Sequence, residues 1–348
     1  AGGGAGSQLI LAPTSTIVAA NFLMDAPVTA VEQRVLLGTA VNTFNVNTLS
    51  VAEDRSSGLF SFNHATLGTL VLRDRAGTGR AAINVGYMGG YTGATPTATM
   101  DLSGHTVDIL ASTLRIGGRT GVGGSNNTAS FTMSAGTLDV TSVLVGDRRN
   151  TGTDSASYSL TGTTTGTLTI MGGVVNIGAT GLAVAMSTST NVSNTVNGTV
   201  NVLGGNVTIN GPVTLGNSTN AKGVANALLA ITGGSVNVRN SITLGNGAGF
   251  ASVTGTIRLA GTASLDLNGF TIGTSGRPIV MQLEAGTLSN VTEINGGSLG
   301  SSVTTKSTAG TLVLANNAAL GTGTFTVNGG VVDASPAATI TNAVTLGA

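Results

Sequence analysis

Apolar and polar residues alternate along most of this chain in short runs. The runs Val143-Leu144-Val145-Gly146 and Val213-Thr214-Leu215-Gly216 each place apolar residues two positions apart and end on a glycine. A period of two is typical of β-strands that bury one face, whereas an amphipathic helix repeats about every 3.6 residues. The pattern therefore predicts a succession of short strands.

These strands recur as a repeat of three runs. In one repeat, Val200-Asn201-Val202 is followed by Gly204-Gly205, then by Val207-Thr208-Ile209 and by Val213-Thr214-Leu215-Gly216. Glycine suits the corners because the chain must turn sharply there, often with positive φ. Other repeats close on small residues in the same way, namely Ala52, Gly86, Gly117, Gly146, Ala185, Gly245 and Gly273.

Three strands this short cannot bury their apolar faces alone, but stacked repeats bury them in one continuous core. We therefore expect an all-β fold, a right-handed parallel β-helix (a β-solenoid) with about ten coils of roughly 21–39 residues each. The register predicts that ten apolar side chains point into this core: Val140, Val145, Ile177, Val184, Ile209, Leu215, Val238, Leu244, Leu267 and Ile272.

The repeat divides the chain into two parts. Residues 44–348 form the predicted solenoid, and residues 1–43 lie outside it. Because an open solenoid end must be covered, residues 1–43 are predicted to be an N-terminal tail, a cap or a subunit-contact segment. Within them, residues 28–37 are expected to form a short helix or an irregular cap.

Four segments of the chain resemble a known repeat. Residues 264–270, 310–317, 318–323 and 325–333 are similar to the autotransporter-associated β-strand repeat of large secreted or surface-anchored bacterial β-helix proteins. The resemblance covers roughly residues 44–348. It implies a β-helix outside the cell or on the surface of a bacterium, and it brings no catalytic motif.

Composition narrows the classes of function. Charged residues make up 8% of the chain, 14 Lys and Arg balance 14 Asp and Glu, and Cys is absent. Without a basic surface, nucleic-acid binding is not expected, and the lack of Cys excludes disulfides and Cys-based metal sites. The apolar runs are too short to span a bilayer, and nothing in the chain predicts a cofactor.

Outward residues of the second strand are expected to form a column along the solenoid. Asp108 and Asp139 belong to this column and are predicted to lie one coil apart, with like charges facing each other. They are the candidates for a bridging cation such as Ca²⁺, although two carboxylates are few for an oxygen shell. The alternative is that both are solvated carboxylates beside arginines. The other members of the column are Asn176, Thr208, Asn237 and Asp266.

Polar loops after the closing small residues are expected to gather on one edge of the rod. Tyr and Arg are enriched at protein contacts, and loops on a rigid scaffold often carry binding function. The predicted partner-binding residues are Tyr87, Tyr91, Arg119, Asp147, Arg148 and Arg149. The alternative is a set of solvated loops with local ion pairs. His64 and His105 are isolated and are predicted to lie on the surface or in loops.

The favoured function is a non-enzymatic structural protein, a β-solenoid protomer of an extracellular bacterial fibre, sheath or surface layer. Open coil ends template further strand pairing, so copies are expected to contact head to tail through Leu9, Ile10, Leu11, Ile17, Val344 and Leu346. Residues 155–221 carry no charge and are the alternative surface for lateral packing.

Two other functions remain open. The chain could be an adhesin that binds glycans or a host or matrix surface through the loop edge. A carbohydrate-active β-helix enzyme is the third reading, but such enzymes need clustered carboxylates, or carboxylates with Arg or Lys, on one groove face, and the acidic residues here are scattered.

Overall fold

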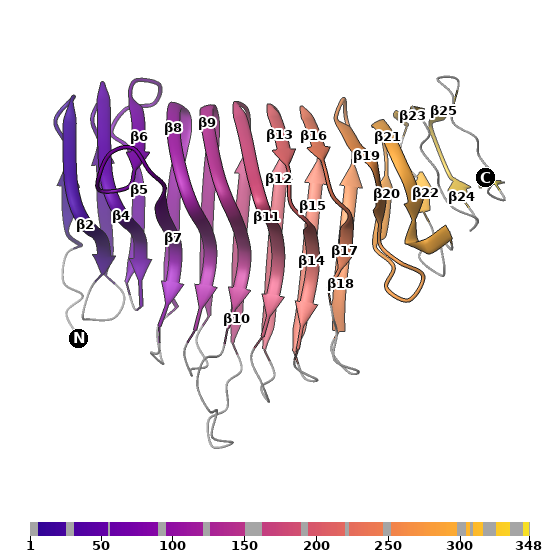
Figure 1. Cartoon of the computed structure of the whole chain (residues 1–348), viewed down its shortest axis with the longest axis horizontal. Helices are drawn as coiled ribbons and strands as arrows, with labels where there is room; N and C mark the ends of the chain where they lie inside the picture. Colours follow the sequence, from indigo (N-terminus) through magenta and orange to yellow (C-terminus); the bar gives the residue numbers. More distant parts are fainter. Residues whose placement is uncertain are drawn as a thin grey trace, which may run out of the picture.

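The computed structural model describes residues 6–25, 31–54, 56–89, 95–120, 126–149, 162–188, 194–219, 223–245, 252–297, 304–306, 309–315, 325–334 and 344–347. Within these ranges the fold is all-β apart from one short 3-10 turn at Asn295–Gly297. Figure 1 shows the strands side by side in a long row, with the two chain termini at opposite ends.

Equivalent strands of successive repeats pair in parallel and form three columns. The first column runs through β1 (Gln8–Ile10), β3 (Glu32–Leu37), β5 (Ser57–Phe62), β8 (Thr97–Arg119), β9 (Asn127–Arg148), β10 (Thr163–Ile170), β12 (Thr195–Val202), β15 (Val224–Ile231), β18 (Ser252–Leu259), β20 (Val280–Leu283), β22 (Thr304–Lys306), β24 (Phe325–Val327) and β26 (Val344–Leu346).

The other two columns share some long strands, because β8, β9 and several others continue around a corner. The second column contains β2 (Ser15–Asp25), β4 (Val41–Glu53), β6 (Thr69–Arg73), the middle of β8 and β9, β11 (Val174–Ser187), β13 (Asn206–Ile209), β16 (Ser235–Val238), β19 (Ser264–Ile272), β21 (Gly286–Ile294), β23 (Thr311–Ala315) and β25 (Val331–Asp333). The third column contains the ends of β2, β4, β8, β9, β11, β19 and β21, together with β7 (Ala81–Met88), β14 (Val213–Ser218) and β17 (Ile242–Leu244). This stacking is solenoid-like, as the alternating pattern predicts.

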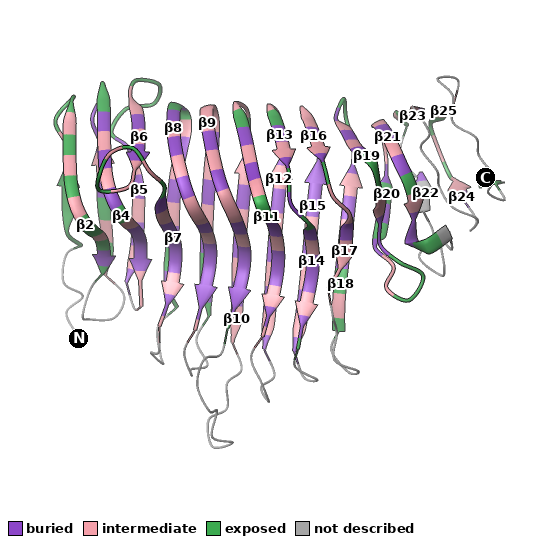
Figure 2. Cartoon of the chain, viewed as in Figure 1, coloured by how far each residue is buried: buried purple, intermediate pink, exposed green. Residues whose placement is uncertain are grey.

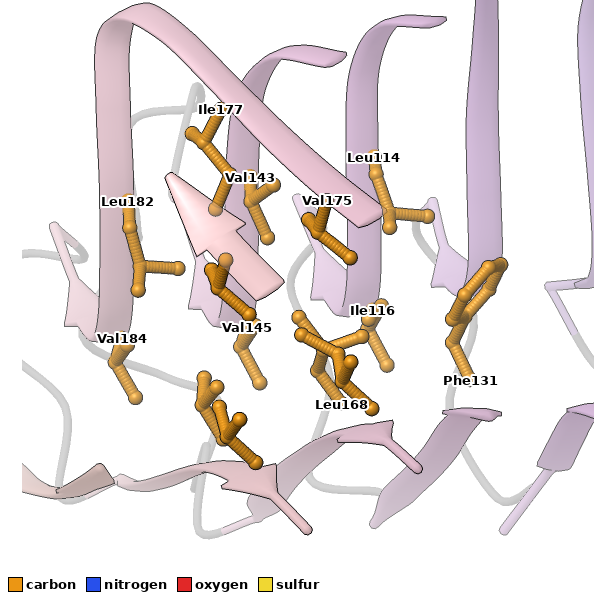
Figure 3. Packing of buried hydrophobic residues seen from close by; sticks show 14 of the residues in the cluster. Leu114, Ile116, Phe131, Val143, Val145, Leu168, Val175, Ile177, Leu182 and Val184 are labelled. Atoms are coloured by element: carbon orange, nitrogen blue, oxygen red, sulfur yellow. The ribbon is translucent and has the colours of Figure 1, made fainter. Parts of the chain in front are cut away.

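One apolar core runs along the inside of the stack, and it confirms the predicted strand faces. Of the ten side chains expected there, nine are buried in the core, and Leu244 is partly buried and packs against it. Val213 and Leu215 are buried while Thr214 between them is half-buried, so the register is the predicted one. Figure 3 shows labelled members from several strands meeting in the interior, and Figure 2 shows buried segments along the whole row.

The corner conformation explains the small residue that closes most repeats, and Gly245 is the exception among the eight closing residues predicted from Ala52 to Gly273. Gly86, Gly117, Gly146, Gly216 and Gly273 all have φ between 64° and 69°, and Ala52 and Ala185 have φ of 58° and 56°. This left-handed region disfavours larger side chains. A Cβ on Gly146 would also lie 2.6 Å from the Asn197 carbonyl oxygen. The corner therefore selects small residues by conformation and by space.

A line of small residues on the first column of strands faces this corner, and the alternating pattern did not reveal it. Its members pair in register along the stack. A Cβ on Gly166 would collide with the backbone of Ile116 and Gly146. Two lines of small residues thus let first and third strands approach closely. The line of small residues on the first column of strands consists of Gly58, Ala98, Ala129, Gly166, Gly198, Ala227 and Gly255.

The N-terminal segment joins the same stack. β1 pairs in parallel with β3, and β2 pairs with β4 from Ser15↔Asn42 to Asp25↔Glu53. The stack of parallel strands therefore begins before residue 44. The expected helix or irregular cap is wrong for the described part of residues 28–37, because Glu32–Leu37 is the strand β3. Gln33 and Val35 lie on the side that faces the core, so alternation continues there.

Candidate functional site

The predicted loop edge consists largely of strand ends. β7 ends at Met88, β8 at Arg119 and β9 at Arg148, so Tyr87, Arg119, Asp147 and Arg148 lie in strands. Arg149 follows β9 directly, and Tyr91 lies outside the described residues. The expectation that these residues occupy loops is therefore wrong for four of them.

The left-handed corner residue shifts the alternation by one position, and this shift separates the predicted residues. Leu114 and Ile116 point inward before Gly117, and Arg119 points inward after it. Arg119 and Arg148 are neighbours in register and are 1% and 2% exposed. They line the interior of the stack and are not on the exposed surface for which they were predicted.

Polar groups occupy the interior at this end of the strands. Asn127 donates from Nδ2 to the carbonyl oxygens of Gly86 and Gly118, at 2.7 and 3.0 Å. Arg148 donates from Nη1 to the Gly162 carbonyl oxygen at 3.1 Å. Burial, and to a lesser degree the charge of Arg148, lowers the pKa of Arg119 to about 10. These residues organise the strand ends from within.

The outward residues form a compact cluster around Asp147. The Asp147 carboxylate is only 2% exposed, and it accepts hydrogen bonds from Nε of Arg115 and Nε of Arg149, both at 3.1 Å. The guanidinium carbon of Arg115 lies 5.3 Å from the centre of the Tyr87 ring. The Tyr87 hydroxyl lies 3.0 Å from Oγ1 of Thr120. The structure thus brings Tyr87, Asp147 and Arg149 together around Arg115.

Sequence reasoning missed Arg115, which connects this cluster. It stands between two inward residues in the run Leu114-Arg115-Ile116-Gly117, and strict alternation places it outward. The cation–π contact with Tyr87 and the bond to Asp147 hold its guanidinium in place. The signal was therefore present as a charged residue at an outward strand position.

A shallow groove of about 460 Å³ lies beside this cluster, where β8, β9 and β11 enter the third column. In register, Thr113 pairs with Ser142, and Ser142 pairs with Gly181. The groove carries several hydroxyl groups together with Arg115 of β8 and Arg149, which follows β9 directly, and its chemistry suits a polar ligand. Its lining residues are Ser112, Thr113, Arg115, Thr141, Ser142, Leu144, Arg149, Thr180, Gly181 and Ala183.

Asp108 and Asp139 are not neighbours. The register pairs Asp108 with Thr137 and Asp139 with Leu110, so the predicted contact between their charges is wrong. Asp139 does continue in register to Asn176. Each carboxylate instead meets an arginine, with Nη2 of Arg73 2.6 Å from Asp108 and Nη2 of Arg80 2.9 Å from Asp139. Among the described residues, no group of three or more His, Cys, Asp or Glu side chains could hold a metal ion.

The two histidines have different environments. His64 is exposed, as expected, but His105 is buried in β8 and stacks on Phe62 with ring centroids 3.9 Å apart. Its Nδ1 lies 2.6 Å from the Ser103 carbonyl oxygen and its Nε2 lies 2.8 Å from the His64 carbonyl oxygen. The predicted surface position is wrong for His105, which packs as a structural residue.

No family model, curated protein or solved structure matches this chain. The geometry of the chain itself therefore carries the functional argument. A search of the described residues for helices long and apolar enough to cross a membrane found none.

Proposed function

We propose that this chain is a non-enzymatic structural protein whose copies stack head to tail as protomers of an extracellular bacterial fibre, sheath or surface layer. The observation that carries the proposal is the N-terminal end of the stack. Among the described strands, β1 pairs only with β3, and β2 pairs only with β4. On these two strands Leu9, Ile10, Val18 and Leu23 are between 43% and 60% exposed. The unpaired edge of such a strand is a template for further strands.

The opposite end of the stack carries matching strands. β26 pairs with β24 and leaves Val344 48% and Leu346 77% exposed, and β25 pairs with β23. β26 belongs to the same column of strands as β1, and β25 belongs to the same column as β2. A head-to-tail contact between β26 and β1 would therefore continue the first column across two copies without changing the strand direction, whereas β25 lies one coil before β26 and would not meet β2 directly.

The register along the first column defines how the two strands would meet. The pairing of Ile10 with Leu36, followed from strand to strand, aligns Leu9 with Val344 and Leu11 with Leu346. The position of Leu11 and Leu346 is apolar and inward in nearly every coil, with Lys306 as the charged member among the described residues. Stacking two copies would therefore extend the core as well as the sheet.

A small groove of about 210 Å³ at the N-terminal end supports the same contact. It lies between β1, β2 and β3, and its apolar lining includes Leu9, Phe22, Leu23 and Val35. Apolar residues of the second copy's last coil are suited to fill it. The contact is heterologous and does not close on itself, so it gives a filament.

The finer features of the proposal rest on general rules and on the resemblance. We infer that the solenoid is right-handed, because parallel crossover connections are right-handed in about 98% of cases. The extracellular bacterial setting rests on the resemblance to autotransporter-associated repeats and on the low charge. A non-enzymatic role is supported by Asp108 and Asp139, which are not register neighbours and therefore do not form a pair of carboxylates.

The experiment is negative-stain microscopy of the purified chain with two matched variants. Leu23 at the N-terminal end and Leu203 on the flank are 52% and 47% exposed, so Leu23→Asp and Leu203→Asp place the same charge at similar exposure. We expect filaments from the wild type and from Leu203→Asp, and short separate rods from Leu23→Asp. Separate rods from the wild type at high protein concentration, or filaments from Leu23→Asp, would overturn the proposal.

A further inference from the structure

The groove on the third column of strands has two features that point to a charged, polyhydroxylated ligand. Its walls present the hydroxyls of Ser112, Thr113, Thr141, Ser142 and Thr180. Two arginines, Arg115 and Arg149, line it as well. The groove therefore combines many neutral hydrogen-bonding groups with a local positive charge.

The charge balance in this groove favours an anion. Asp147 is almost completely buried, whereas Arg115 is 18% and Arg149 44% exposed, so two guanidinium groups face solvent in front of one covered carboxylate. Both arginines donate to Asp147 from Nε. This arrangement leaves their Nη groups to bind a second acceptor. Guanidinium groups bind carboxylates and sulfates with two parallel hydrogen bonds.

The side chains are held in position before any ligand binds. Asp147 holds both guanidinium groups through ion pairs, and the Arg115 guanidinium also packs against the Tyr87 ring. A preorganised site loses less side-chain entropy on binding. Thr113 and Ser142 are register neighbours, so their hydroxyl groups lie at the parallel strand spacing of about 4.8 Å.

We propose that this groove binds an acidic polysaccharide, with the ligand's carboxylates on Arg115 and Arg149 and its hydroxyls on the Ser and Thr row. The rest of the chain is close to electrically neutral, with a formal net charge of zero. A polymer held only by its overall charge would need a broad basic surface. Binding is therefore local to this groove, and it does not depend on the head-to-tail assembly proposed above.

The test is calorimetric titration of the full chain with polygalacturonate, with dextran sulfate and with neutral dextran. The Leu23→Asp background keeps the protein as separate rods, if the assembly proposal is correct, and the wild type is measured alongside. We expect polygalacturonate to bind and to weaken as salt rises, and neutral dextran to bind at least ten-fold more weakly. Tighter binding of dextran sulfate than of polygalacturonate would change the ligand from a carboxylated to a sulfated polymer and would overturn the assignment.

Substitutions assign the binding to the groove. Arg149→Gln removes an exposed guanidinium and is expected to weaken polygalacturonate binding at least ten-fold, and Arg115→Gln is expected to do the same. Arg239→Gln is the matched control, because Arg239 is exposed and hydrogen-bonded to Asn237 and Asn210 away from the groove. Absence of binding by the wild type, or equal affinity for Arg149→Gln and Arg239→Gln, would refute the proposal.

Discussion

The close approach of the first and third strands predicts a large effect from a single methyl group. Gly166 lies in the middle of the stack, and its missing Cβ would point at backbone atoms of Ile116 and Gly146. Its φ is not in the left-handed region, so Gly166→Ala tests space and not backbone conformation. Overpacking costs about 1–3 kcal/mol, and the upper half of that range applies because backbone atoms cannot rotate away. Ala98 and Ala129 belong to the same line of small residues as Gly166 and do carry a Cβ, so a Cβ fits at positions where the corner opposite leaves more room.

Hydrogen exchange is the suitable assay because stacked repeats open locally. A cost of 1.4 kcal/mol corresponds to a ten-fold change in an equilibrium, so a cost of about 2–3 kcal/mol predicts about 30- to 140-fold faster exchange in β9, β10 and β12. Gly276→Ala is the matched control, since a Cβ there meets nothing within 4 Å. Unchanged exchange in Gly166→Ala would refute the reasoning, because the two lines of small residues would then not be in contact.

Three further substitutions test other parts of the stack. Ala185→Gly should leave the melting temperature nearly unchanged, because relief of left-handed strain, about 1–2 kcal/mol, is offset by the flexibility cost of glycine, about 0.5–1 kcal/mol, and by the loss of a buried methyl group, about 0.8 kcal/mol; a large fall in melting temperature would contradict this. Burial, with the nearby charges of Asp54 and Asp25, raises the pKa of Glu53, so ionised Glu53 lowers the folded state's stability at neutral pH. Glu53→Gln should therefore melt higher at pH 7, and its advantage should shrink as pH falls through the raised pKa and vanish below 4.5; a constant difference would disprove the assignment. Ile209→Asp should cost about 4 kcal/mol or more by burying an unpaired charge, and a wild-type melting temperature would exclude Ile209 from the core.

The alternation of apolar residues was sufficient to predict the strands and their faces. Val213, Leu215 and Ile242 occupy the core because a period of two leaves no other face to bury. The small closing residues were also predictable as corners, and the structure adds their left-handed conformation at Gly146 and Ala185.

The polar residues after the corners could not be placed in the same way. A left-handed residue at Gly117 or Gly146 reverses the alternation, so Arg119 and Arg148 turn inward where simple counting places them on an edge. The register change between Leu102 and Thr106 likewise moves Asp108 away from Asp139. Local backbone conformation decides both, and it depends on the packing of neighbouring coils.

The most direct test of head-to-tail stacking uses the absence of Cys from the chain. Continued register places Leu9 beside Val344 of the next copy, and parallel strands about 4.8 Å apart match the Cα separation of 4.4–6.8 Å that a disulfide needs. Leu9→Cys and Val344→Cys are prepared separately, mixed under mild oxidation and analysed by mass spectrometry, with Leu203→Cys in place of Leu9→Cys as control. The account predicts a mixed disulfide between Leu9→Cys and Val344→Cys in large excess over the control pair. Equal yields from the two mixtures, or dimers formed mainly within each variant alone, would contradict head-to-tail stacking.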